Sequence, residues 1–407
     1  MPEETRGRRW RRRLWRLLKW GTAAFLLVGG ALMFEMWTAF GQPPKGEHLA
    51  RIQQSPRYIE GRFRNALRRY DHMWDAARRW VKGGPNREPD APPPIERRQA
   101  SDYATPPASG LRITWFGHSS MLIEIDGVRL LTDPVWGKRA SPSRLGGPAR
   151  FHEPPMALED LPALDAVVIS HDHYDHLDWP TITRLLARDV RFITPLGVGA
   201  HLQYWGVPAE RITELDWWGQ AQVGAVTLHC TPARHFSGRF LGGTDQTLWA
   251  SWAMVGPDHR AYFSGDGAMS PDFAVIGERL GPFDVTLMES GAYDPAWADV
   301  HMGPEQAVEA HRALRGRVLM PVHWGTFNLA LHGWTEPVER LLAAAKPLGV
   351  PVVVPKPGGW FEPDAPPALV RWWPELPWQP ASETPIVSSG LAQALPAPDG
   401  VAVAVSE

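Results

Sequence analysis

Between about residues 111 and 360, the chain consists mainly of short runs of β-branched and aromatic residues, which are separated by Gly, Pro and Asp turn signals. The runs are RITWFG, SMLIEID, VRLLTD, DAVVISH, RFITP, VTLHC, LWASWAMV, RAYFSGD, DVTLMES and VLMPVHW. Helical periodicity lies between them at 180–189, 304–316 and 335–345. Strands that come first in hairpins and then alternate with helices predict an α/β (α+β) fold, with sheets covered by helices.

The N-terminal part of the chain has a different pattern, an apolar stretch at 21–40 that follows a basic segment at 1–20. About 20 helical residues are enough to cross a hydrocarbon core of roughly 30 Å. Trp20 and Trp37 stand where interfacial anchors are expected, and Glu35 is the only charge in the stretch. The pattern therefore predicts a transmembrane signal-anchor with a cytoplasmic N-terminus, in a bacterial inner membrane with the rest of the chain exported. A cleaved signal peptide and a helix lying on the membrane surface remain alternatives.

The region 41–110 is expected to hold an amphipathic helical part and a linker. Leu49–Val81 shows helical, basic periodicity whose apolar stripe either packs on the domain that follows or lies beside the bilayer. The stripe consists of Phe63, Leu67, Tyr70, Trp74 and Trp80. Residues 83–109 are dense in Pro, Gly and charge, which is typical of a linker.

The main folded domain is expected to span 111–363, followed by a Pro- and Ala-rich tail at 364–407 that is disordered from about Ser382. The single cysteine, Cys230, excludes an intramolecular disulfide and a cysteine-built metal site. The formal net charge of −2 gives no reason to expect a nucleic-acid partner. A homodimer is left open.

The segment SHDHYDHLD carries the strongest chemical signal. It follows the apolar run DAVVI and places His171, His173, Asp175 and His176 within six consecutive positions, at the end of a buried strand. Imidazole and carboxylate are zinc ligands, and two ions need more of them than four residues supply. His235, Asp266 and His323 each follow another strand-like run, so the same sheet edge is expected to bring them in.

This pattern of His-x-His-x-Asp-His followed by a distant His, Asp and His resembles the metallo-β-lactamase superfamily. The resemblance implies an αββα four-layer sandwich, two mixed β-sheets packed face to face and flanked by helices, here with an N-terminal transmembrane helix. It also implies two Zn²⁺ ions per chain. The first would be held by His171, His173 and His235, the second by Asp175, His176 and His323, with Asp266 bridging the two.

The sequence around these residues resembles one branch of that superfamily, the N-acylphosphatidylethanolamine-hydrolysing phospholipases D. The similarity rests on TWFGHSSMLIEIDGVRLLTDPVWGKRASPSRLGGPARF, PARHFSGR, LWASW, HMGPEQAVEAH and HWGTF. It implies a phosphodiesterase acting on a membrane lipid, with Tyr174 and His301 as substrate contacts and Asp175, Asp266 and His301 as catalytic groups. His301 is alternatively a helix-start residue. His118 and Asp133 are landmarks of the resemblance that are expected to support the ligands or a turn.

Further features leave alternatives open. Basic side chains in the segment after Asp133 could steer a phosphate, although a solvated loop is the simpler expectation; they are Arg139, Arg144 and Arg150. Some of the 21 tryptophans, Trp136 among them, could line a lipid groove rather than pack in the core. The other functions considered are a hydrolase of a soluble lactone or phosphodiester and a non-catalytic membrane scaffold; a nuclease is disfavoured because no basic stretch lies near the site.

Overall fold

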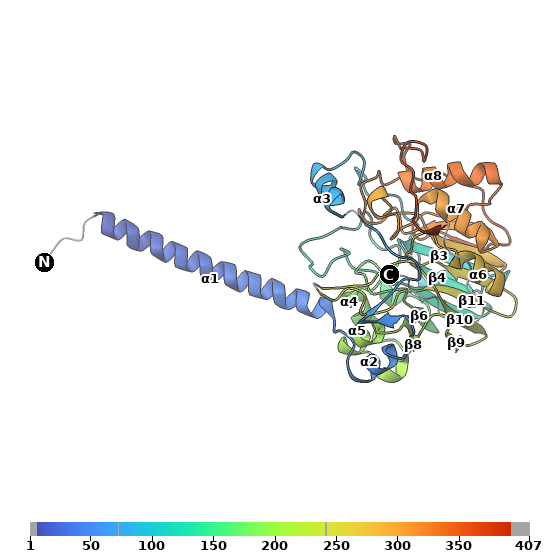
Figure 1. The fold of residues 1–407 in the computed structure, drawn as a ribbon, viewed down its shortest axis with the longest axis horizontal. Helices are drawn as coiled ribbons and strands as arrows, with labels where there is room; N and C mark the ends of the chain where they lie inside the picture. Colours follow the sequence, from blue (N-terminus) through green and yellow to red (C-terminus); the bar gives the residue numbers. More distant parts are fainter. Residues whose placement is uncertain (1–5, 72, 241, 392–407) are drawn as a thin grey trace.

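Two β-sheets packed face to face form the centre of the computed structural model, which describes residues 6–71, 73–240 and 242–391 (Figure 1). The first sheet has the strand order β15 (Trp360–Phe361), β3 (Leu111–Gly117), β4 (Ser120–Ile125), β5 (Val128–Thr132), β6 (Ala166–Val168), β7 (Arg191–Pro195), β8 (Ile212–Leu215). The second has the order β14 (Gly316–Val322), β13 (Phe283–Glu289), β12 (Arg260–Phe263), β11 (Ser251–Val255), β10 (Val226–Thr231), β9 (Gln220–Val223). Both sheets are mixed, because each joins antiparallel hairpins to parallel strands.

The two-residue period of the strands decides which side chains fill the space between the sheets. Met121, Ile123 and Ile125 of β4 face the second sheet and belong to the largest buried cluster. Leu122, between them in sequence, points to the opposite face and packs in a separate cluster with residues of the covering helices. Strands such as β3 and β4 are therefore buried on both faces, whereas the edge strand β9 alternates exposed and buried residues.

Helices cover the outer face of each sheet (Figure 1). The helices are α1 (Arg6–Phe40), α2 (Gly46–Ile52), α3 (Met73–Lys82), α4 (Trp179–Leu185), α5 (Val198–Tyr204), α6 (Asp272–Leu280), α7 (Pro304–Ala313) and α8 (Glu336–Ala345). Short 3₁₀ turns lie at Ala100–Tyr103, Leu158–Asp160, Ala209–Arg211, Pro295–Trp297 and Lys346–Leu348. Helices α4 and α5 cover the first sheet, and α6, α7 and α8 cover the second. The expected four-layer sandwich is confirmed.

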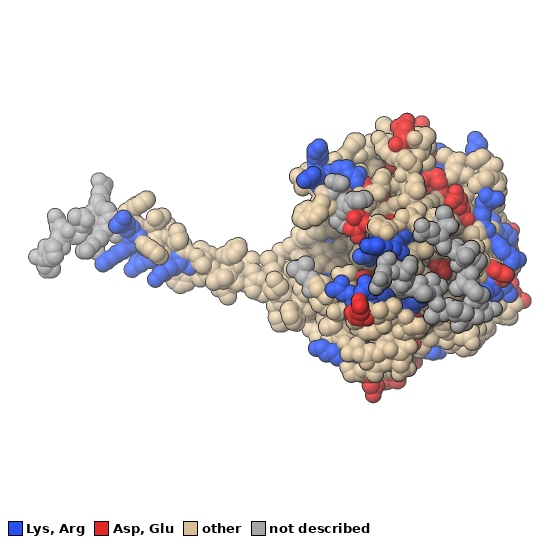
Figure 2. Space-filling view, viewed as in Figure 1, with Lys and Arg blue, Asp and Glu red and all other residues tan. Residues whose placement is uncertain are grey.

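Helix α1 projects from this sandwich as a long rod (Figure 1). Its part from Trp10 to Phe40 has 31 residues with a mean hydropathy of 1.6 in its most apolar window, and none of that window is buried. Lys and Arg side chains gather at the end far from the sandwich, and the stretch next to the sandwich carries none (Figure 2). The helix is long and apolar enough to cross a membrane.

The continuous helical pattern expected over Leu49–Val81 is wrong. Among the described residues of this range, only those of α2 and α3 are helical, and a hairpin of β1 (Tyr58–Ile59) and β2 (Arg62–Phe63) lies between the two helices. Glu60 and Gly61 both have positive φ at its turn, a geometry that a helix cannot contain. The apolar stripe is broken as a result, because Phe63 is buried while Trp74 is 86% exposed.

The segment expected to be a linker and the start of the expected tail both pack on the sandwich. Tyr103 is buried against the first sheet, and Glu96 N–H donates to Pro357 O. Trp372 and Trp373 belong to the largest core cluster, and Ile386 is buried against Tyr293. Burial of large apolar side chains orders these Pro-rich segments. The domain boundary expected at 363 is therefore wrong, and so is the disorder expected from Ser382, because the chain packs on the sandwich as far as residue 391. Residues 392–407 lie outside the described part of the chain.

Candidate metal centre

The expected ligands converge at one edge of the sandwich, where strands of both sheets end. His171, His173, Asp175 and His176 lie on the loop between β6 and α4. His235, Asp266 and His323 follow β10, β12 and β14, which belong to the other sheet. Because the sheets stack face to face, the ends of their strands bring the two sets of side chains together.

One group of possible ligand atoms consists of His171, His173, His235 and Asp266, all within 4.8 Å of one another. His173 Nδ1 lies 2.9 Å from His171 Nε2 and 3.3 Å from His235 Nε2. Three imidazole nitrogens that face one another at these distances form a cradle suited to a cation that accepts nitrogen ligands.

The second group consists of Asp175, His176, His323 and His118. Asp175 Oδ2 lies 3.4 Å from His176 Nε2, 3.2 Å from His323 Nε2 and 3.0 Å from His118 Nε2. His118 is fully buried and has φ +53, and its carbonyl accepts from His323 N–H at 3.1 Å. The structure thus places His118 against a candidate ligand, and its ring is close enough to be counted with the group.

Asp266 stands between the two groups. Its Oδ2 is 3.1 Å from His176 Nε2 and 3.0 Å from His323 Nε2, and it is 3.8 Å from both His171 Nε2 and His235 Nε2. His176 Nε2 and Asp266 Oδ1 are buried without a hydrogen-bond partner. Such orphaned buried polar atoms are costly unless something binds them, and the donor set matches what divalent zinc accepts. The residues therefore fit a pair of metal ions.

The outward nitrogens of these histidines are held by hydrogen bonds. His176 Nδ1 lies 2.7 Å from Asp133 Oδ2, and His235 Nδ1 lies 2.9 Å from Val300 O. Ser170 N–H donates to Asp133 Oδ1 at 2.7 Å. Asp133 thus orients His176 and the start of the ligand loop together, which is the supporting role expected for it.

The histidines of the cluster differ in pKa, because the two carboxylates act on them unequally. Burial acts to lower the pKa of His176, but the carboxylates of Asp266 and Asp175 outweigh it and raise that pKa well above its usual range. Burial also acts to lower the pKa of His323. The same two carboxylates outweigh it and raise that pKa to about 10. The pKa values of His171 and His235 are held well below their usual range, mainly by burial. The two carboxylates therefore draw positive charge into the space between the groups.

His301 lies beside the cluster and is positioned by a residue that the sequence analysis missed. Glu289 Oε2 lies 2.9 Å from His301 Nδ1, and Glu289 Oε1 accepts from Met302 N–H at 3.0 Å. Glu289 is fully buried, and burial and the charge of Asp266 raise its pKa well above the usual range. The sequence does carry a signal for Glu289, which is a polar residue near the end of the apolar run DVTLMES. The same kind of signal identifies Asp266. His301 lies three positions before Pro304, the first residue of α7, and Gly303 is the N-cap of that helix, so His301 does not cap it.

Of the other expected side chains, Tyr174 lies near the cluster and Arg150 is excluded from it. The Tyr174 hydroxyl donates to the carbonyl of Arg239, whose guanidinium stacks on the Tyr174 ring. The Arg150 guanidinium donates to Val135 O at 2.7 Å and to His152 O at 3.2 Å, and burial lowers its pKa to about 10. Arg150 therefore holds the loop 135–152 together and does not steer a phosphate.

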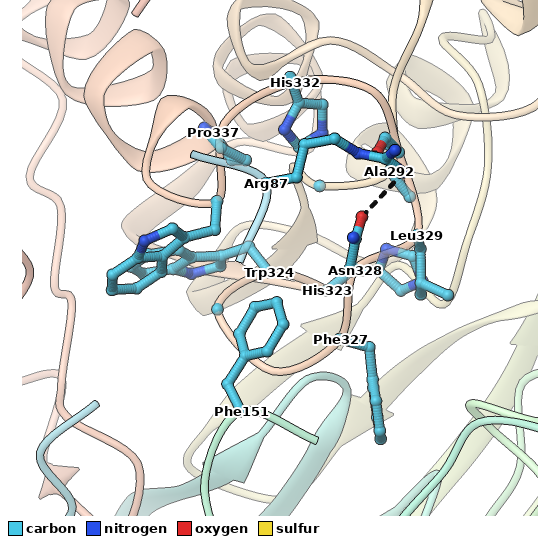
Figure 3. A pocket seen from close by; sticks show the side chains of 14 residues that line it. Arg87, Phe151, Ala292, His323, Trp324, Phe327, Asn328, Leu329, His332 and Pro337 are labelled. Carbon is cyan, nitrogen blue, oxygen red and sulfur yellow. Dashed lines mark hydrogen bonds between the residues drawn. The ribbon is translucent and has the colours of Figure 1, made fainter. Parts of the chain in front are cut away.

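A small cavity lies behind the loop that follows His323 (Figure 3). Its volume is about 20 Å³, room for about one water molecule and too small for a substrate. Arg87 donates to Asn328 Oδ1 at 3.1 Å and to Ala330 O at 2.9 Å, so the segment 83–109 fixes this loop from outside (Figure 3).

Comparisons with known proteins agree with this geometry. The β-lactamase superfamily domain matches residues 128–324. An uncharacterised protein of Mycobacterium tuberculosis is 52% identical over 336 residues, which cover 79% of this chain and 88% of that protein. N-acyl-phosphatidylethanolamine-hydrolyzing phospholipase D 1 of Caenorhabditis elegans is 39% identical over 265 residues, which cover 62% of this chain and 74% of that protein. The isothiocyanate hydrolase from Delia radicum gut bacteria shares the fold, with a TM-score of 0.51, 18% identity, and 62% of this chain and 98% of that chain covered.

The fold and the site thus define a hydrolase of the metallo-β-lactamase superfamily with candidate metal-binding clusters of His and Asp. Within the superfamily, the chain belongs to the branch of the N-acylphosphatidylethanolamine-hydrolysing phospholipases D.

Proposed function

We propose that this protein is a zinc-dependent phosphodiesterase of the phospholipase D type that acts on N-acylphosphatidylethanolamine-like membrane lipids. The observation that carries the proposal is the meeting of two ligand groups at Asp266. The activity for which the Caenorhabditis elegans relative is named supports the substrate class.

Two Zn²⁺ ions would be held by the seven expected residues. His171 Nε2, His173 Nδ1 and His235 Nε2 would bind the first, and Asp175, His176 and His323 would bind the second. Asp266 would be shared. When bound, such a pair of ions would supply a water of lowered pKa and neutralise the charge that develops on the phosphoryl group.

The chain's own side chains have separate tasks in this reaction. Asp175 and Asp266 orient the attacking water. Its oxygen forms a bond to phosphorus while the bond from phosphorus to the N-acylethanolamine oxygen breaks, leaving phosphatidic acid. The departing oxygen needs a proton, and we assign its donation to His301, which Glu289 holds beside the cluster. Tyr174 contacts the substrate beside the ligand loop.

Helix α1 would anchor the enzyme in the membrane that contains its substrate. Its arginine-rich end would stay on the cytoplasmic side, and the sandwich would lie on the opposite side. The alternative of a soluble lactone or phosphodiester substrate does not require this anchor.

The test uses the full chain in nanodiscs that contain N-acylphosphatidylethanolamine, in water enriched in ¹⁸O, with products analysed by mass spectrometry. We expect N-acylethanolamine and ¹⁸O-labelled phosphatidic acid, loss of both products after chelation, and recovery with Zn²⁺. Asp266→Asn should abolish turnover, whereas Asp258→Asn, an exposed carboxylate in the loop before β12, should not. Label in the N-acylethanolamine, or chelator-sensitive hydrolysis of lactones without lipid cleavage, would overturn the proposal.

A further inference from the structure

The chain between β2 and α3 contacts the loop that carries His235. Phe63, the last residue of β2, is fully buried in one cluster with Ala233, and its N–H donates to Asp245 O at 2.8 Å. Ala233 and Asp245 both belong to the loop between β10 and β11. Segment 63–70 is therefore attached at its start to the loop of a candidate metal ligand.

The side chain of Asn65 pairs with the backbone of His235. Asn65 Nδ2 donates to His235 O at 2.7 Å, and His235 N–H donates to Asn65 Oδ1 at 3.1 Å. Since an N–H can only donate and a carbonyl can only accept, these two bonds also determine which way the amide of Asn65 faces. His235 lies beyond Thr231, the last residue of β10, so Asn65 supplies the kind of pairing that a neighbouring strand gives inside a sheet.

A second contact of the same segment reaches another ligand of the first group. The Arg69 guanidinium lies 4.8 Å from the centre of the Phe236 ring. The Phe236 ring in turn packs edge-to-face on the His173 ring, with the ring centres 4.4 Å apart. Segment 63–70 thus contacts the surroundings of both His173 and His235.

A third contact fixes the residue next to the carbonyl that holds the His235 ring. Tyr70 N–H donates to Asp299 Oδ2 at 3.0 Å, and Asp299 Oδ1 lies 3.0 Å from Arg234 Nη2. The following residue, Val300, offers its carbonyl to His235 Nδ1 at 2.9 Å. Both the backbone and the ring of His235 are therefore supported through segment 63–70.

The loop of His235 needs such support. It spans 232–250 and contains Gly238, Gly242 and Gly243, which allow many backbone conformations. A ligand side chain has to be held within about 0.5 Å of its binding position. Segment 63–70 lies outside the residues 128–324 that match the superfamily domain, so this support comes from a part of the chain added to that domain.

We infer that Asn65 is a positioning residue of the metal centre, which holds His235 in the orientation that binds the first ion. The inference rests on the metal centre of the proposed function and not on its lipid substrate. Without the pairing, the His235 backbone would move and the first ion would keep His171, His173 and Asp266. The ligands of the second ion would keep their positions.

The test is stepwise Co²⁺ titration of the metal-free full chain in detergent, followed by the hyperfine-shifted imidazole N–H signals of the bound histidines in proton NMR. His235→Ala identifies the signals of the first ion. Asn65→Asp keeps the size and the acceptor but loses the donor, and Asn65→Leu loses both without adding a charge. Each should weaken binding of the first ion by about 10–100-fold and leave binding of the second nearly unchanged.

Asn86→Asp is the matched control. It makes the same isosteric change in a segment where the backbone carbonyl of Asn86 accepts from Trp334 N–H at 2.8 Å, and it should bind both ions like the unmodified chain. Unaltered binding of the first ion in the Asn65 variants would show that His235 needs no support and overturn the inference. Equal weakening of both ions would overturn it in favour of a general loosening of the fold, and weakening in Asn65→Asp alone would assign the effect to the added charge.

The same titration separates this inference from the proposed function. An unmodified chain that binds two Co²⁺ ions, loses the first selectively in both Asn65 variants and cleaves no lipid would support the inference and overturn the proposed function. An unmodified chain that binds no Co²⁺ would overturn both.

Discussion

Asp133 shows how single side chains outside the ligand set control the centre. It is fully buried, and its two oxygens hold His176 Nδ1 and Ser170 N–H at 2.7 Å each. A histidine whose outer nitrogen is held by a carboxylate is fixed in orientation and is a stronger ligand.

Asp133→Asn should therefore weaken metal binding by about 10–100-fold, because an amide cannot accept both hydrogen bonds with a full negative charge. Chelator competition on the purified protein measures this affinity directly. Asp165→Asn, at an exposed position before β6, should leave it unchanged. Unaltered affinity in Asp133→Asn would mean that His176 needs no support from Asp133.

His301→Ala should lower kcat for the lipid by about 10²–10⁴-fold, because the leaving oxygen would lose its proton donor. Metal content should stay the same, since His301 is outside the seven expected ligands. The loss should be much smaller for bis(p-nitrophenyl) phosphate, whose leaving group departs without a proton. His229→Ala on strand β10 serves as the matched control. An equal loss with both substrates would exclude the proton-donor role.

At the scale of secondary-structure elements, a carboxylate in a turn joins the two sheets. Asp126 lies in the β4–β5 turn with φ +49, and it accepts from the backbone N–H groups of Asp258 and His259 at 3.0 and 3.1 Å. It also contacts His259 Nδ1 at 2.6 Å. Since β4–β5 belongs to one sheet and the 256–259 turn to the other, Asp126 links the ends of the two hairpins.

This link should make stability depend on pH. Burial acts to raise the pKa of Asp126, but hydrogen bonds from His259 and Asp258 outweigh it and lower the pKa below its usual value. A depressed folded pKa adds stability above the unfolded pKa of about 3.9 that is lost as the pH falls through the folded value.

Asp126→Asn should thus reduce the free energy of unfolding by about 1–3 kcal/mol at pH 6–7. The difference from the unmodified chain should shrink as the pH falls below about 4. Urea unfolding at several pH values measures it, with Asp258→Asn as the control. A difference that is constant down to the lowest pH would show that the charge of Asp126 is not the cause.

For the molecule as a whole, α1 has two separable parts. The stretch up to Trp37 has most of its surface exposed, whereas Thr38, Ala39 and Gln42 are held by the body. Anchoring and docking therefore belong to adjacent segments of one helix and its exit.

Deletion of residues 1–37 should abolish membrane association and leave the thermal stability of the body almost unchanged. Deletion of residues 1–42 should additionally lower the free energy of unfolding by about 1–3 kcal/mol, because Arg239 and Trp205 lose their acceptors. Vesicle flotation and thermal unfolding of both variants measure the two effects. Equal stability of the two deletions would show that the docking contacts contribute nothing.

Much of the sandwich and the cluster of candidate ligands could be predicted from the sequence, because these features depend on short windows. Two-residue alternation and turn residues identified the strands from β3 to β7 and from β10 to β14. The spacing of SHDHYDHLD, with polar residues at the ends of apolar runs, identified seven side chains that the structure brings together. The weaker strands β8, β9 and β15 and the helices α5 and α6 were missed, because they are short or have mixed patterns.

Only the tertiary structure decided which distant residues support these features. The contact of Glu289 with His301, the approach of His118 to Asp175 and the docking of Ala39 on Arg239 each join segments whose separation along the chain carries no local signal. The same is true of Trp372 and Trp373, which turn a Pro-rich segment into part of the core. Local pattern determines which side chains can do chemistry, and the stacking of two sheets determines which of them meet.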